Sequence, residues 1–470
     1  MPTTAMPMMP VHDPVDLLNP DMNGGEYRPV NLCPGLDFVF VTSGPDAVDR
    51  MDDRMDDRMV DRMGDRMGAP LDQTLRLFGD TELGDSAATG FSIEEVSDGG
   101  AVPFLKATNN TPFGVVLIAG QLVKGGKQNR GVSTDIFILS GQSAKIPVTC
   151  VEQGRWSGRP GARFQAAGVE PITIRVSKFR GVSDSRRERR SFEADQSSVW
   201  RDIDHMSHAV QARASGGDLL DSLEQFKGRR MSRNHHAPAD TPAQSDGAEV
   251  QRLEEQIREV RQQARAVTER LDAALSHGDH VTVVTIRRSL DLMVQRLTQL
   301  ERELTETRER LATPVGISSI DPARLAAADE AARGAIGLLV LFNGEFLAGD
   351  LFASPDWFAK FYGDLRDSAL MSWDMVARRC ATEGRAMDPA ASAKAQSLAR
   401  SVVNDALRGT WTDRPAAAHG RSQMLEHPYL ESAMLADHNG TPLHVLLGCR
   451  QTPEILRAAT QAAAPVHWRR

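Results

Sequence analysis

Two runs of apolar residues with the spacing of a helix face constrain the fold of this chain more than any other feature. The first run is Leu253, Ile257, Val260, Ala264, Val267 and Leu271, and the second is Ile286, Leu290, Met293, Leu297, Leu300 and Leu304. Between them lies Ser276–His280, in which Gly278 is a helix stop and Asp279 a candidate N-cap. Two seams of equal length joined by a tight turn predict an antiparallel coiled-coil hairpin over residues 249–312, with arms of about 35–45 Å. The alternative is one continuous coiled coil that dimerises.

The segments before this hairpin are dominated by strand patterns. Strands are predicted at Leu36–Thr42, Ala101–Ala107, Gly114–Ala119, Asp135–Leu139 and Ala144–Val151, with turn residues between them. The residues Ile172, Ile174 and Val176 alternate with polar residues, which predicts a further strand with one buried face. Pro147 falls inside a predicted strand, so that strand should lie at an edge or carry a bulge. Many strands with short turns predict a sandwich or a barrel.

After the hairpin the chain mixes helices and strands. The dipeptide Asn343-Gly344 between two apolar runs predicts a β-hairpin with a type I′ turn. Ser354 followed by Pro355 predicts a helix start, because serine caps the free amides of the first turn and proline fits the first helical position. The predicted fold class is therefore α+β: a β-rich N-terminal half that resembles a sandwich or barrel, a mixed α/β C-terminal half and the inserted antiparallel coiled-coil hairpin.

These patterns divide the chain into predicted parts. They are a flexible arm at 1–30, a β-rich domain with a terminal helix at 31–226, a linker at 227–248, the hairpin at 249–312 and an α+β part at 316–470 that packs on the β-rich part. Within the β-rich domain, an Asp-Arg-Met repeat with a period of four falls in the low-complexity stretch 43–70. On a helix this period drifts by about 40° per repeat, so its Met residues form no fixed stripe. We expect a surface loop, and a Met-rich partner surface is the alternative.

Composition excludes several classes of function. The net charge of −8 argues against a dedicated DNA binder, so no nucleic-acid partner is expected. The four cysteines are scattered and form no CxxC pair, which is typical of a reducing compartment. Neither a signal peptide nor a run of about 18 apolar residues is present, so we expect a cytoplasmic protein with no membrane partner. No pattern in the sequence names a cofactor.

The polar loop Lys124–Arg130 is the first candidate for a binding site. Its two glycines allow a backbone turn whose amides can face an anion. Lys127 and Arg130 add positive charge, and Gln128 and Asn129 add directional donors and acceptors. We call Lys127–Arg130 the KQNR loop. It suits a phosphate, a carboxylate or a sugar, although a polar glycine turn without a ligand is the alternative.

The second candidate is Glu152–Trp156, here the EQGRW segment. Glu152 continues the buried phase of the preceding strand, so it needs a partner, and Arg130 or Lys127 is the natural candidate. We expect a pair of Glu152 with Arg130. A buried or half-buried carboxylate there predicts a catalytic acid or base. Arg155 and Trp156 could stack on a planar ring, or the tryptophan could close the core at the strand end. Cys150 is predicted to be a small buried hydrophobe rather than a nucleophile.

A turn at Ser140–Gln142 should fold the chain back on itself. We therefore predict that the KQNR loop lies beside the EQGRW segment, with a polar hollow between them.

Two weaker candidate sites lie elsewhere in the chain. Asp204, His205 and His208 share a helix but lack further ligands for a metal, and none is predicted. The basic run Arg186–Arg190 could steer anions or be a solvated loop.

Several of these segments resemble a bacterial domain family. They are Gly120–Arg130, Ile146–Trp156, Asp195–Trp200, Tyr27–Phe40 and Gly344–Trp373. The family is named for its association with ADP-ribosylglycohydrolases and with rhodanese and phosphatase-superfamily proteins. The resemblance covers roughly residues 27–210 and 316–450, and it adds Gln196 and Asp350 to the candidate ligand-binding residues. This chain departs from the family pattern at Gln121, where relatives carry an acidic residue.

The resemblance implies a role near NAD or ADP-ribose metabolism, but a family label does not establish a reaction. One hypothesis is a domain that binds or processes a nucleotide-sugar ligand. In it, the KQNR loop holds the anionic part, Arg155 and Trp156 pack on the planar part, and Glu152 orients the ligand or acts as acid or base. The other hypothesis is a non-catalytic interaction protein that binds a protein partner through residues 249–312.

Overall fold

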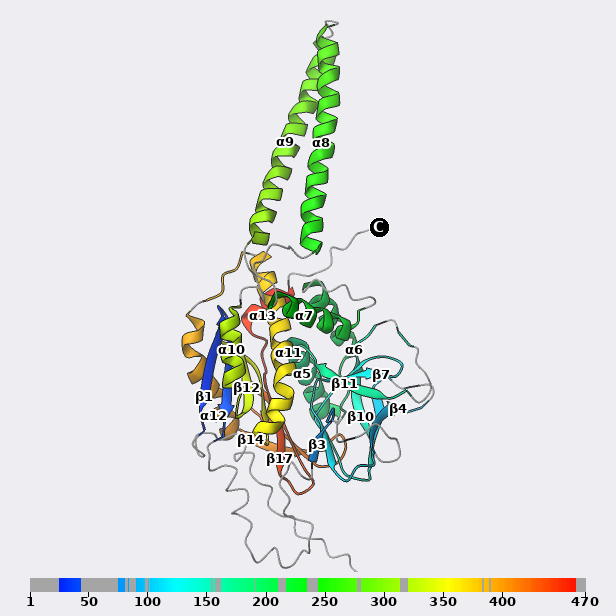
Figure 1. Cartoon of the computed structure of the whole chain (residues 1–470), viewed down its shortest axis with the longest axis vertical. Helices are drawn as coiled ribbons and strands as arrows, with labels where there is room; N and C mark the ends of the chain where they lie inside the picture. The colour runs from blue at the N-terminus through cyan, green and yellow to red at the C-terminus, as the bar shows by residue number, and fades with distance from the viewer. Residues whose placement is uncertain are drawn as a thin grey trace, which may run out of the picture. The chain divides into compact units, whose positions relative to one another are not determined.

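The fold was analysed in a computed structural model of the whole chain (Figure 1). It describes residues 25–43, 75–80, 83, 90–97, 100, 102–153, 155–156, 162–189, 191–209, 217–234, 244–276, 280–312, 320–382, 384–388 and 390–461. The chain divides into two compact units, one of Met1–Arg230 with Ser319–Arg470 and one of Met231–Ser318. The first 24 residues of the predicted arm and the Asp-Arg-Met repeat lie outside the described residues.

The first unit contains an eight-stranded antiparallel sheet in the order β1-β2-β12-β13-β17-β16-β15-β14. Its strands are β1 (Tyr27–Cys33), β2 (Leu36–Thr42), β12 (Ala335–Phe342), β13 (Glu345–Phe352), β14 (Thr410–Arg414), β15 (Arg421–Glu426), β16 (Leu430–Ala436) and β17 (Pro442–Cys449). Strand β2, which the sequence places with the β-rich half, pairs with β12 of the C-terminal half. The two ends of this unit therefore share one sheet.

The turn and cap signals of the C-terminal half are confirmed. Asn343 and Gly344 both have positive φ, at 50° and 77°, as a type I′ turn between β12 and β13 requires. The Ser354 hydroxyl accepts a hydrogen bond from the Trp357 amide at 3.3 Å at the start of α11. Local polar residues therefore fix where these elements begin and end.

Helices cover this sheet and join it to the rest of the unit. They are α5 (Ile172–Arg189), α6 (Gln196–Ala209), α7 (Leu219–Asn234), α10 (Pro322–Ala331), α11 (Pro355–Thr382), α12 (Ala395–Arg408) and α13 (Glu454–Gln461), with a 3₁₀ turn at Ala391–Lys394. Helix α12 packs on β1 and β2, and α11 contacts β12 as well as α5 and α6. Figure 1 shows α11 between the large sheet and the smaller strands near β11, which it also contacts. This helix therefore joins the two β regions.

The smaller strands form a second β region around its own apolar core. A six-stranded sheet has the order β11-β7-β8-β10-β5-β4, and a three-stranded sheet has the order β3-β6-β9. The strands are β3 (Leu75–Leu77), β4 (Phe91–Glu95), β5 (Phe104–Asn109), β6 (Gly114–Leu117), β7 (Gln121–Gly125), β8 (Arg130–Val132), β9 (Ile136–Ile138), β10 (Ser143–Cys150) and β11 (Phe164–Val169). The edge strands β11 and β4 contact each other, so the larger of the two sheets curls.

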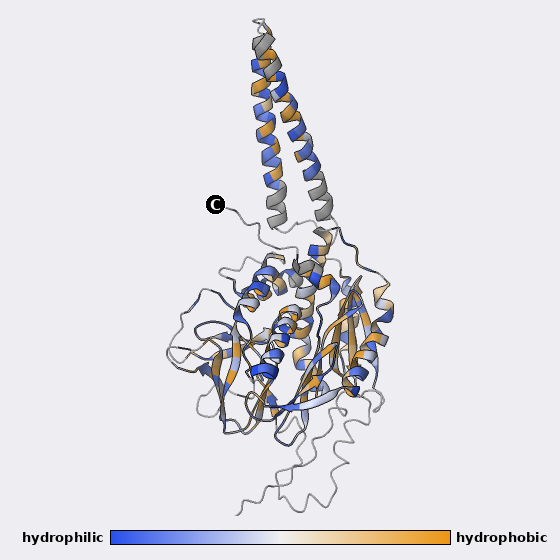
Figure 2. Ribbon diagram, turned by 180° about the vertical axis from the view of Figure 1, so that it is seen from behind, coloured by the Kyte–Doolittle hydropathy of each residue, from blue (hydrophilic) through white to orange (hydrophobic). Residues whose placement is uncertain are grey.

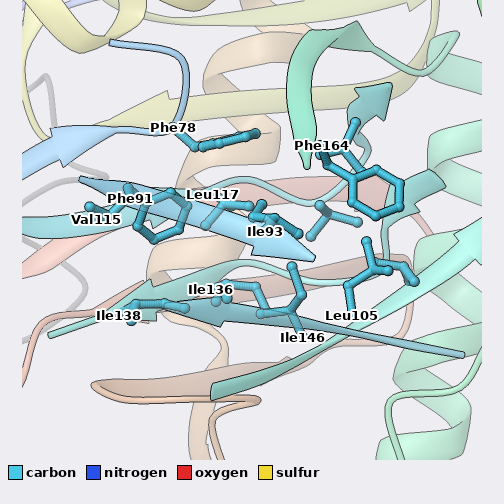
Figure 3. Packing of buried hydrophobic residues seen from close by; sticks show 14 of the residues in the cluster. Phe78, Phe91, Ile93, Leu105, Val115, Leu117, Ile136, Ile138, Ile146 and Phe164 are labelled. Atoms are coloured by element: carbon cyan, nitrogen blue, oxygen red, sulfur yellow. The ribbon is translucent and has the colours of Figure 1, made fainter. Parts of the chain in front are cut away.

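Buried side chains from both of these sheets meet in one cluster. Phe91, Leu105 and Ile146 come from the six-stranded sheet, and Leu117 and Ile136 from the three-stranded one (Figure 3). Alternate residues of each strand face this cluster, which is the period of a half-buried strand. The predicted α+β class with a sandwich-like or barrel-like N-terminal half is therefore confirmed.

Two local predictions are wrong. Residues Ile172–Arg189 form helix α5, so the predicted strand does not exist and Arg186–Arg189 of the basic run are helical rather than a solvated loop. The alternation was short, whereas the buried residues Ile172, Val176 and Phe179 follow the spacing of a helix face.

Pro147 lies in β10, which is an inner strand without a bulge, so the expectation of an edge or bulged strand is also wrong. Residues Ser143–Pro147 pair with β5, and Val148–Cys150 pair with β8. The proline sits where the ladder passes from one neighbour to the other. Its carbonyl still accepts a hydrogen bond from the Ser133 amide at 3.0 Å, and its missing N–H interrupts neither stretch.

The second unit contains helices α8 (Gln244–Ser276) and α9 (His280–Ala312). Leu253 and Ile257 near the start of α8 pack with Leu300 near the end of α9, which makes the pair antiparallel. An Arg261–Glu301 ion pair of 2.7 Å adds a polar contact between them. Figure 2 shows hydrophobic and hydrophilic residues alternating along both helices. None of the described helices is long and apolar enough to cross a membrane.

Candidate functional site

The KQNR loop joins β7 to β8 and is shaped by two glycines. Gly125 and Gly126 have φ of +140° and +50°. A side chain on Gly126 would meet the Phe164 ring at 2.2 Å, so only glycine fits this turn. Strand β8 then pairs with the end of β10, where Arg130 lies directly opposite Cys150. This pairing places the first residue of β8 next to the start of the EQGRW segment.

The Arg130 guanidinium lies inside the protein at 0% exposure. One terminal nitrogen donates to Gln128 Oε1 at 2.8 Å and to Cys150 Sγ at 2.9 Å. Its Nε and its other terminal nitrogen have no hydrogen-bond partner among the described residues. The nearest carboxylate oxygen is Glu95 Oε1, at 4.0 Å from Nη2, which is too far for a hydrogen bond. Arg130 is thus a buried charge with unused donors.

Glu95 at the end of β4 faces this arginine and is also incompletely bonded. Its Oε1 accepts from the Lys127 backbone amide at 3.0 Å. Its Oε2 is buried and has no partner in the part of the chain that the structure describes. Sequence reasoning missed Glu95, because no motif or spacing marks this carboxylate. Unused donors and an unused acceptor therefore lie close together at this position.

Trp156 stands over these groups. Its ring centroid is 5.4 Å from the Arg130 guanidinium carbon and 5.7 Å from Lys127 Nζ, within cation–π range. A Cβ on Gly100 would lie 3.3 Å from the Trp156 ring and 3.3 Å from Glu95 Oε2, so this glycine borders both groups. The residue is 45% exposed, so the alternative that this tryptophan closes the core is wrong. The ring lies between the buried guanidinium and solvent.

Glu152 pairs with Arg155 rather than with Arg130. Its two oxygens accept from Arg155 Nε and Nη2, both at 2.6 Å, and Oε2 also accepts from the Asn129 amide at 3.0 Å. Burial favours a higher pKa, but these bonds outweigh it and lower the pKa of Glu152. The predicted pair with Arg130 is wrong because β10 ends at Cys150, so Glu152 no longer follows the strand phase.

Gln128 and Asn129 hold the two segments together. Gln128 donates to the Glu152 carbonyl at 2.9 Å. Asn129 accepts from the Gly125 amide at 3.1 Å and donates to Asp218 at 3.1 Å. Both side chains are buried, so they point into the structure rather than toward solvent. The KQNR loop therefore lies beside the EQGRW segment, as predicted. The Gln128 and Asn129 side chains, however, are largely occupied by hydrogen bonds within the protein.

Gln196 and Cys150 are joined through the backbone of β10. Gln196 Oε1 accepts from the Cys150 amide and its Nε2 donates to the Cys150 carbonyl, each at 2.8 Å. These two bonds fix the start of α6 against the strand end. Burial raises the pKa of the Cys150 thiol, which fits its predicted role as a buried, unreactive side chain.

Asp350 lies in a different cluster, and no contact joins it to Arg130, Glu152 or Trp156. It accepts two hydrogen bonds from Arg175, at 2.7 and 2.5 Å. His444 lies at 3.1 Å from Asp350 and at 2.9 Å from Asp135. We call Asp135, Arg175, Asp350 and His444 the paired network, since every member is buried and bonded to another.

The charges of the paired network support one another. Burial alone would lower the pKa of His444, but Asp135 and Asp350 raise it to about 9. Burial would raise the pKa of Asp350, yet Arg175 and His444 lower it to about 2. The imidazole is therefore protonated between two carboxylates at neutral pH. Sequence reasoning missed Arg175, because the predicted strand pattern places it on an exposed face.

Gln121, at the departure from the family pattern, has a structural role. Its Nε2 donates to the Phe78 carbonyl at 2.9 Å, and the side chain is buried. Of the three candidate metal ligands on α6, the His208 side chain lies outside the described residues. Among the described residues, no group of three or more His, Cys, Asp or Glu side chains could hold a metal ion.

Comparisons with known proteins bear on the central region of the chain. No curated protein and no solved structure matches the chain. The family resemblance read from the sequence is confirmed over a continuous span that contains the KQNR loop, the EQGRW segment, α5 and α6. Residues 80–247 match the family model of the ARG and Rhodanese-Phosphatase-superfamily-associated Protein domain, and the chain is similar to this family through that span.

Proposed function

We propose that this protein binds an anionic ligand with a planar group, of the nucleotide-sugar type, at Arg130 and Trp156. ADP-ribose derivatives and NAD are the first ligands to test, because the domain that matches residues 80–247 is named for an association with ARG proteins. The single observation that carries the proposal is the Arg130 guanidinium, which is fully buried and keeps two nitrogens unbonded by the described residues.

An unpaired buried guanidinium is costly to the folded state. Leaving a buried charged donor unsatisfied costs about 1–3 kcal/mol or more, and proteins normally pair such groups. Arg130 instead meets neutral Gln128, a thiol of raised pKa and a carboxylate oxygen at 4.0 Å. An oxyanion bound at Nε and Nη2 would complete its bonding, with charge-assisted hydrogen bonds stronger than neutral ones.

Trp156 supplies the second half of the recognition. Its exposed ring lies over Arg130 and next to Lys127, and an indole face stacks on any base. A ligand with a phosphate for Arg130 and a flat ring for Trp156 would satisfy both groups. Burying the ring against such a ligand would also remove apolar surface from water.

Glu152 enters the proposal as an ionised group. Its lowered pKa and its bonds to Arg155 and the Asn129 amide keep it deprotonated at neutral pH. In this state it suits a base or an orienting group better than an acid. Glu95, with one free buried oxygen, is a second carboxylate within the same group of residues.

Thermal unfolding with ADP-ribose, NAD and ribose 5-phosphate tests the proposal. A ligand at 100 times its Kd adds about 2.7 kcal/mol to the free energy of unfolding, so a rise in Tm of several degrees is expected. Trp156→Ala removes an exposed ring and should leave the unliganded Tm nearly unchanged. We expect it to weaken binding about 5- to 150-fold, the equivalent of about 1–3 kcal/mol of stacking.

Lys124→Ala is the matched control, since Lys124 lies in β7 just before the loop but is exposed and pairs with Glu224. It should bind the ligand like the wild type, and Arg130→Ala should not bind it. If no ligand in the panel raises the Tm, or if Trp156→Ala and Arg130→Ala respond like the wild type, the proposed site is wrong.

A second function is favoured by apolar residues on the outside of the α8–α9 pair. Leu275, Leu292 and Val294 are 49%, 61% and 58% exposed, although the seam between the helices is buried. Leu275 lies in α8 and the other two lie in α9, and large exposed apolar side chains of this kind are typical of a partner surface. We propose that these helices bind a protein partner, with a second copy of the chain as the first one to test.

Sedimentation velocity of the full chain measures this association directly. Leu292→Glu with Val294→Glu should convert a concentration-dependent dimer to a monomer. Exchanging exposed polar positions of the same helix, Arg287→Gln with Arg288→Gln, changes the net charge by the same −2 and is the control for charge alone. A monomer at all concentrations for the wild type would exclude a second copy as the partner.

A further inference from the structure

Arg186 in the last turn of α5 is a second buried guanidinium with unusual bonding. The residue is 5% exposed. One terminal nitrogen donates to the Pro415 carbonyl at 3.2 Å and to Ser422 Oγ at 2.9 Å, and the group lies 5.1 Å from the Phe192 ring centroid. Its Nε is buried and unbonded among the described residues. Arg186 therefore meets only neutral acceptors.

The carboxylates nearest to Arg186 are committed to other cations. Glu431 accepts two hydrogen bonds from Arg187, at 2.9 and 2.5 Å. Asp135 pairs with His444 at 2.9 Å. Both attract Arg186 from a distance without bonding it. Burial, with further repulsion from Arg187 and Arg414, lowers the pKa of Arg186 to about 10. Neither carboxylate therefore bonds to the Arg186 guanidinium.

Arg414 lies on the same face of the sheet as the partner of Arg186. Strands β14 and β15 pair with Arg414 directly opposite Ser422, and opposed residues of an antiparallel pair project to one side. Ser422 is the residue that accepts from Arg186. Arg414 Nη2 pairs with Glu426 at 3.5 Å, and its Nε is buried without a partner in the described chain. The side chain as a whole is 34% exposed. Arg414 therefore connects this position to solvent.

We propose that Arg186, Arg414 and Ser422 form an anion-binding site, separate from Arg130, for a compact doubly charged oxyanion such as phosphate. Two guanidinium Nε donors and a hydroxyl match the several acceptor oxygens of a tetrahedral dianion. Arginine is well suited to this role because its planar group binds oxyanions directionally. The bound anion would supply the negative charge for Arg186, because Glu431 and Asp135 are bonded to other cations.

The site gives a role to a motif that the fold did not explain. The basic run Arg186–Arg190 is predicted from the sequence either to steer anions or to be a solvated loop. The structure places its first residue inside the protein, at the end of a helix. Cations at a helix C-terminus are favoured by the helix dipole, but that effect requires no burial. A bound anion accounts for the burial as well.

Titration of inorganic phosphate against Tm, at constant ionic strength set with NaCl, tests the proposal. The wild type should show a saturable rise of a few degrees, and sulfate should act similarly. Acetate carries one charge and should give less than half of that shift. Because Arg130 is itself proposed to bind an oxyanion, the titration is made in the Arg130→Met background, which should keep a saturable rise. Adding Arg414→Gln to that background should abolish the rise, since it removes the partly exposed arginine and leaves Arg186 in place.

Controls separate this site from the rest of the surface. Arg408→Gln, at the end of α12 outside the cluster, should respond to phosphate like the wild type. Trp156→Ala should also respond like the wild type, because it alters only the Arg130 site. A phosphate effect that is linear and unsaturable, or one that persists when Arg130→Met and Arg414→Gln are combined, would overturn the proposal, as would no effect on the wild type or on Arg130→Met.

Discussion

Arg130 and Arg175 are both fully buried arginines in the first unit, and they are bonded in opposite ways. Arg175 donates two hydrogen bonds to Asp350 and one to the Ala119 carbonyl at 2.6 Å. Arg130 has no carboxylate within hydrogen-bond distance and leaves two nitrogens unbonded by the described residues. The hydrogen-bonding capacity of the buried guanidinium is thus largely used at Arg175 and only partly used at Arg130.

This difference distinguishes a structural role from a candidate functional one. The paired network connects residues that are far apart in the chain, since Asp350 lies in β13 of the large sheet while Asp135 precedes β9 of the smaller region. A satisfied buried network rigidifies the fold. The Arg130 group lies under an exposed tryptophan instead. A ligand would gain the most binding free energy by bonding to such unsatisfied donors.

The largest effect is expected from breaking the paired network. Asp350→Ala leaves Arg175 buried without its carboxylate and removes one partner of His444. Removing one member of a buried ion pair costs about 3–5 kcal/mol, because the remaining charge is uncompensated. Urea unfolding measures this loss. Asp184→Ala, which removes an exposed partner of Arg187, is the control and should cost less than about 1 kcal/mol.

If Asp350→Ala cost no more than Asp184→Ala, the paired network would have no structural role. Arg175 could then no longer serve as the example of a buried arginine with a structural role. A loss of ligand response without a loss of stability would instead place Asp350 in the binding site, as the family resemblance implies.

The next effect is a dependence of stability on pH that comes from His444. Its folded pKa of about 9 is above its ordinary value of 6.5. Its contribution is therefore fully present below about pH 6.5 and is lost as the pH rises through 9. The pKa difference corresponds to about 3 kcal/mol, at roughly 1.4 kcal/mol per unit. Urea unfolding between pH 6 and pH 10 measures this decline.

His444→Gln is the matched variant for this test. It keeps a polar side chain of similar size but cannot carry a charge. Its stability should be lower than that of the wild type at pH 6, and the difference should shrink as the pH approaches 10. Parallel pH profiles for the two proteins would show that His444 does not titrate in this range.

A smaller effect is expected when the incomplete arginine is replaced. Arg130→Met fills a similar volume and removes a charge that lacks good partners, so the loss of stability should be about 1–2 kcal/mol. Arg175→Met should cost about 3–5 kcal/mol, because it leaves Asp350 short of its strongest partner. Urea unfolding of both variants sharpens the comparison. Equal losses would mean that Arg130 is as well stabilised as Arg175.

The sequence predicted elements whose signals are local. The Asn343-Gly344 turn and the Ser354 cap depend on backbone preferences of a few residues, and the α8 and α9 seams on helix spacing. The neighbourhood of the KQNR loop and the EQGRW segment also follows from a short stretch of chain. These features need no knowledge of the distant chain.

The sequence did not predict features that depend on distant partners. Helix α5 was mistaken for a strand and a loop, because a five-residue alternation outweighed the longer helix spacing. The strand pattern predicts that Arg175 faces solvent. Arg175 is buried instead, because Asp350, which is far along the chain, compensates its charge. The prediction pairs Glu152 with Arg130, but its partner is Arg155, because the sequence does not show that β10 ends at Cys150.

The smallest effect concerns the ion pair between Glu152 and Arg155, whose side chains are 12% and 34% exposed. Glu152→Gln should lower the free energy of unfolding by about 0.2–1 kcal/mol in low salt, and the loss should shrink in 1 M NaCl as screening weakens the pair. Because the folded pKa of Glu152 is lowered from 4.5, this contribution is present above about pH 4.5 and disappears as the pH falls. Glu224→Gln, from an exposed pair, is the control and should show a smaller loss. A loss for Glu152→Gln that is large and insensitive to salt would place Glu152 with the paired network rather than with the incomplete group around Arg130.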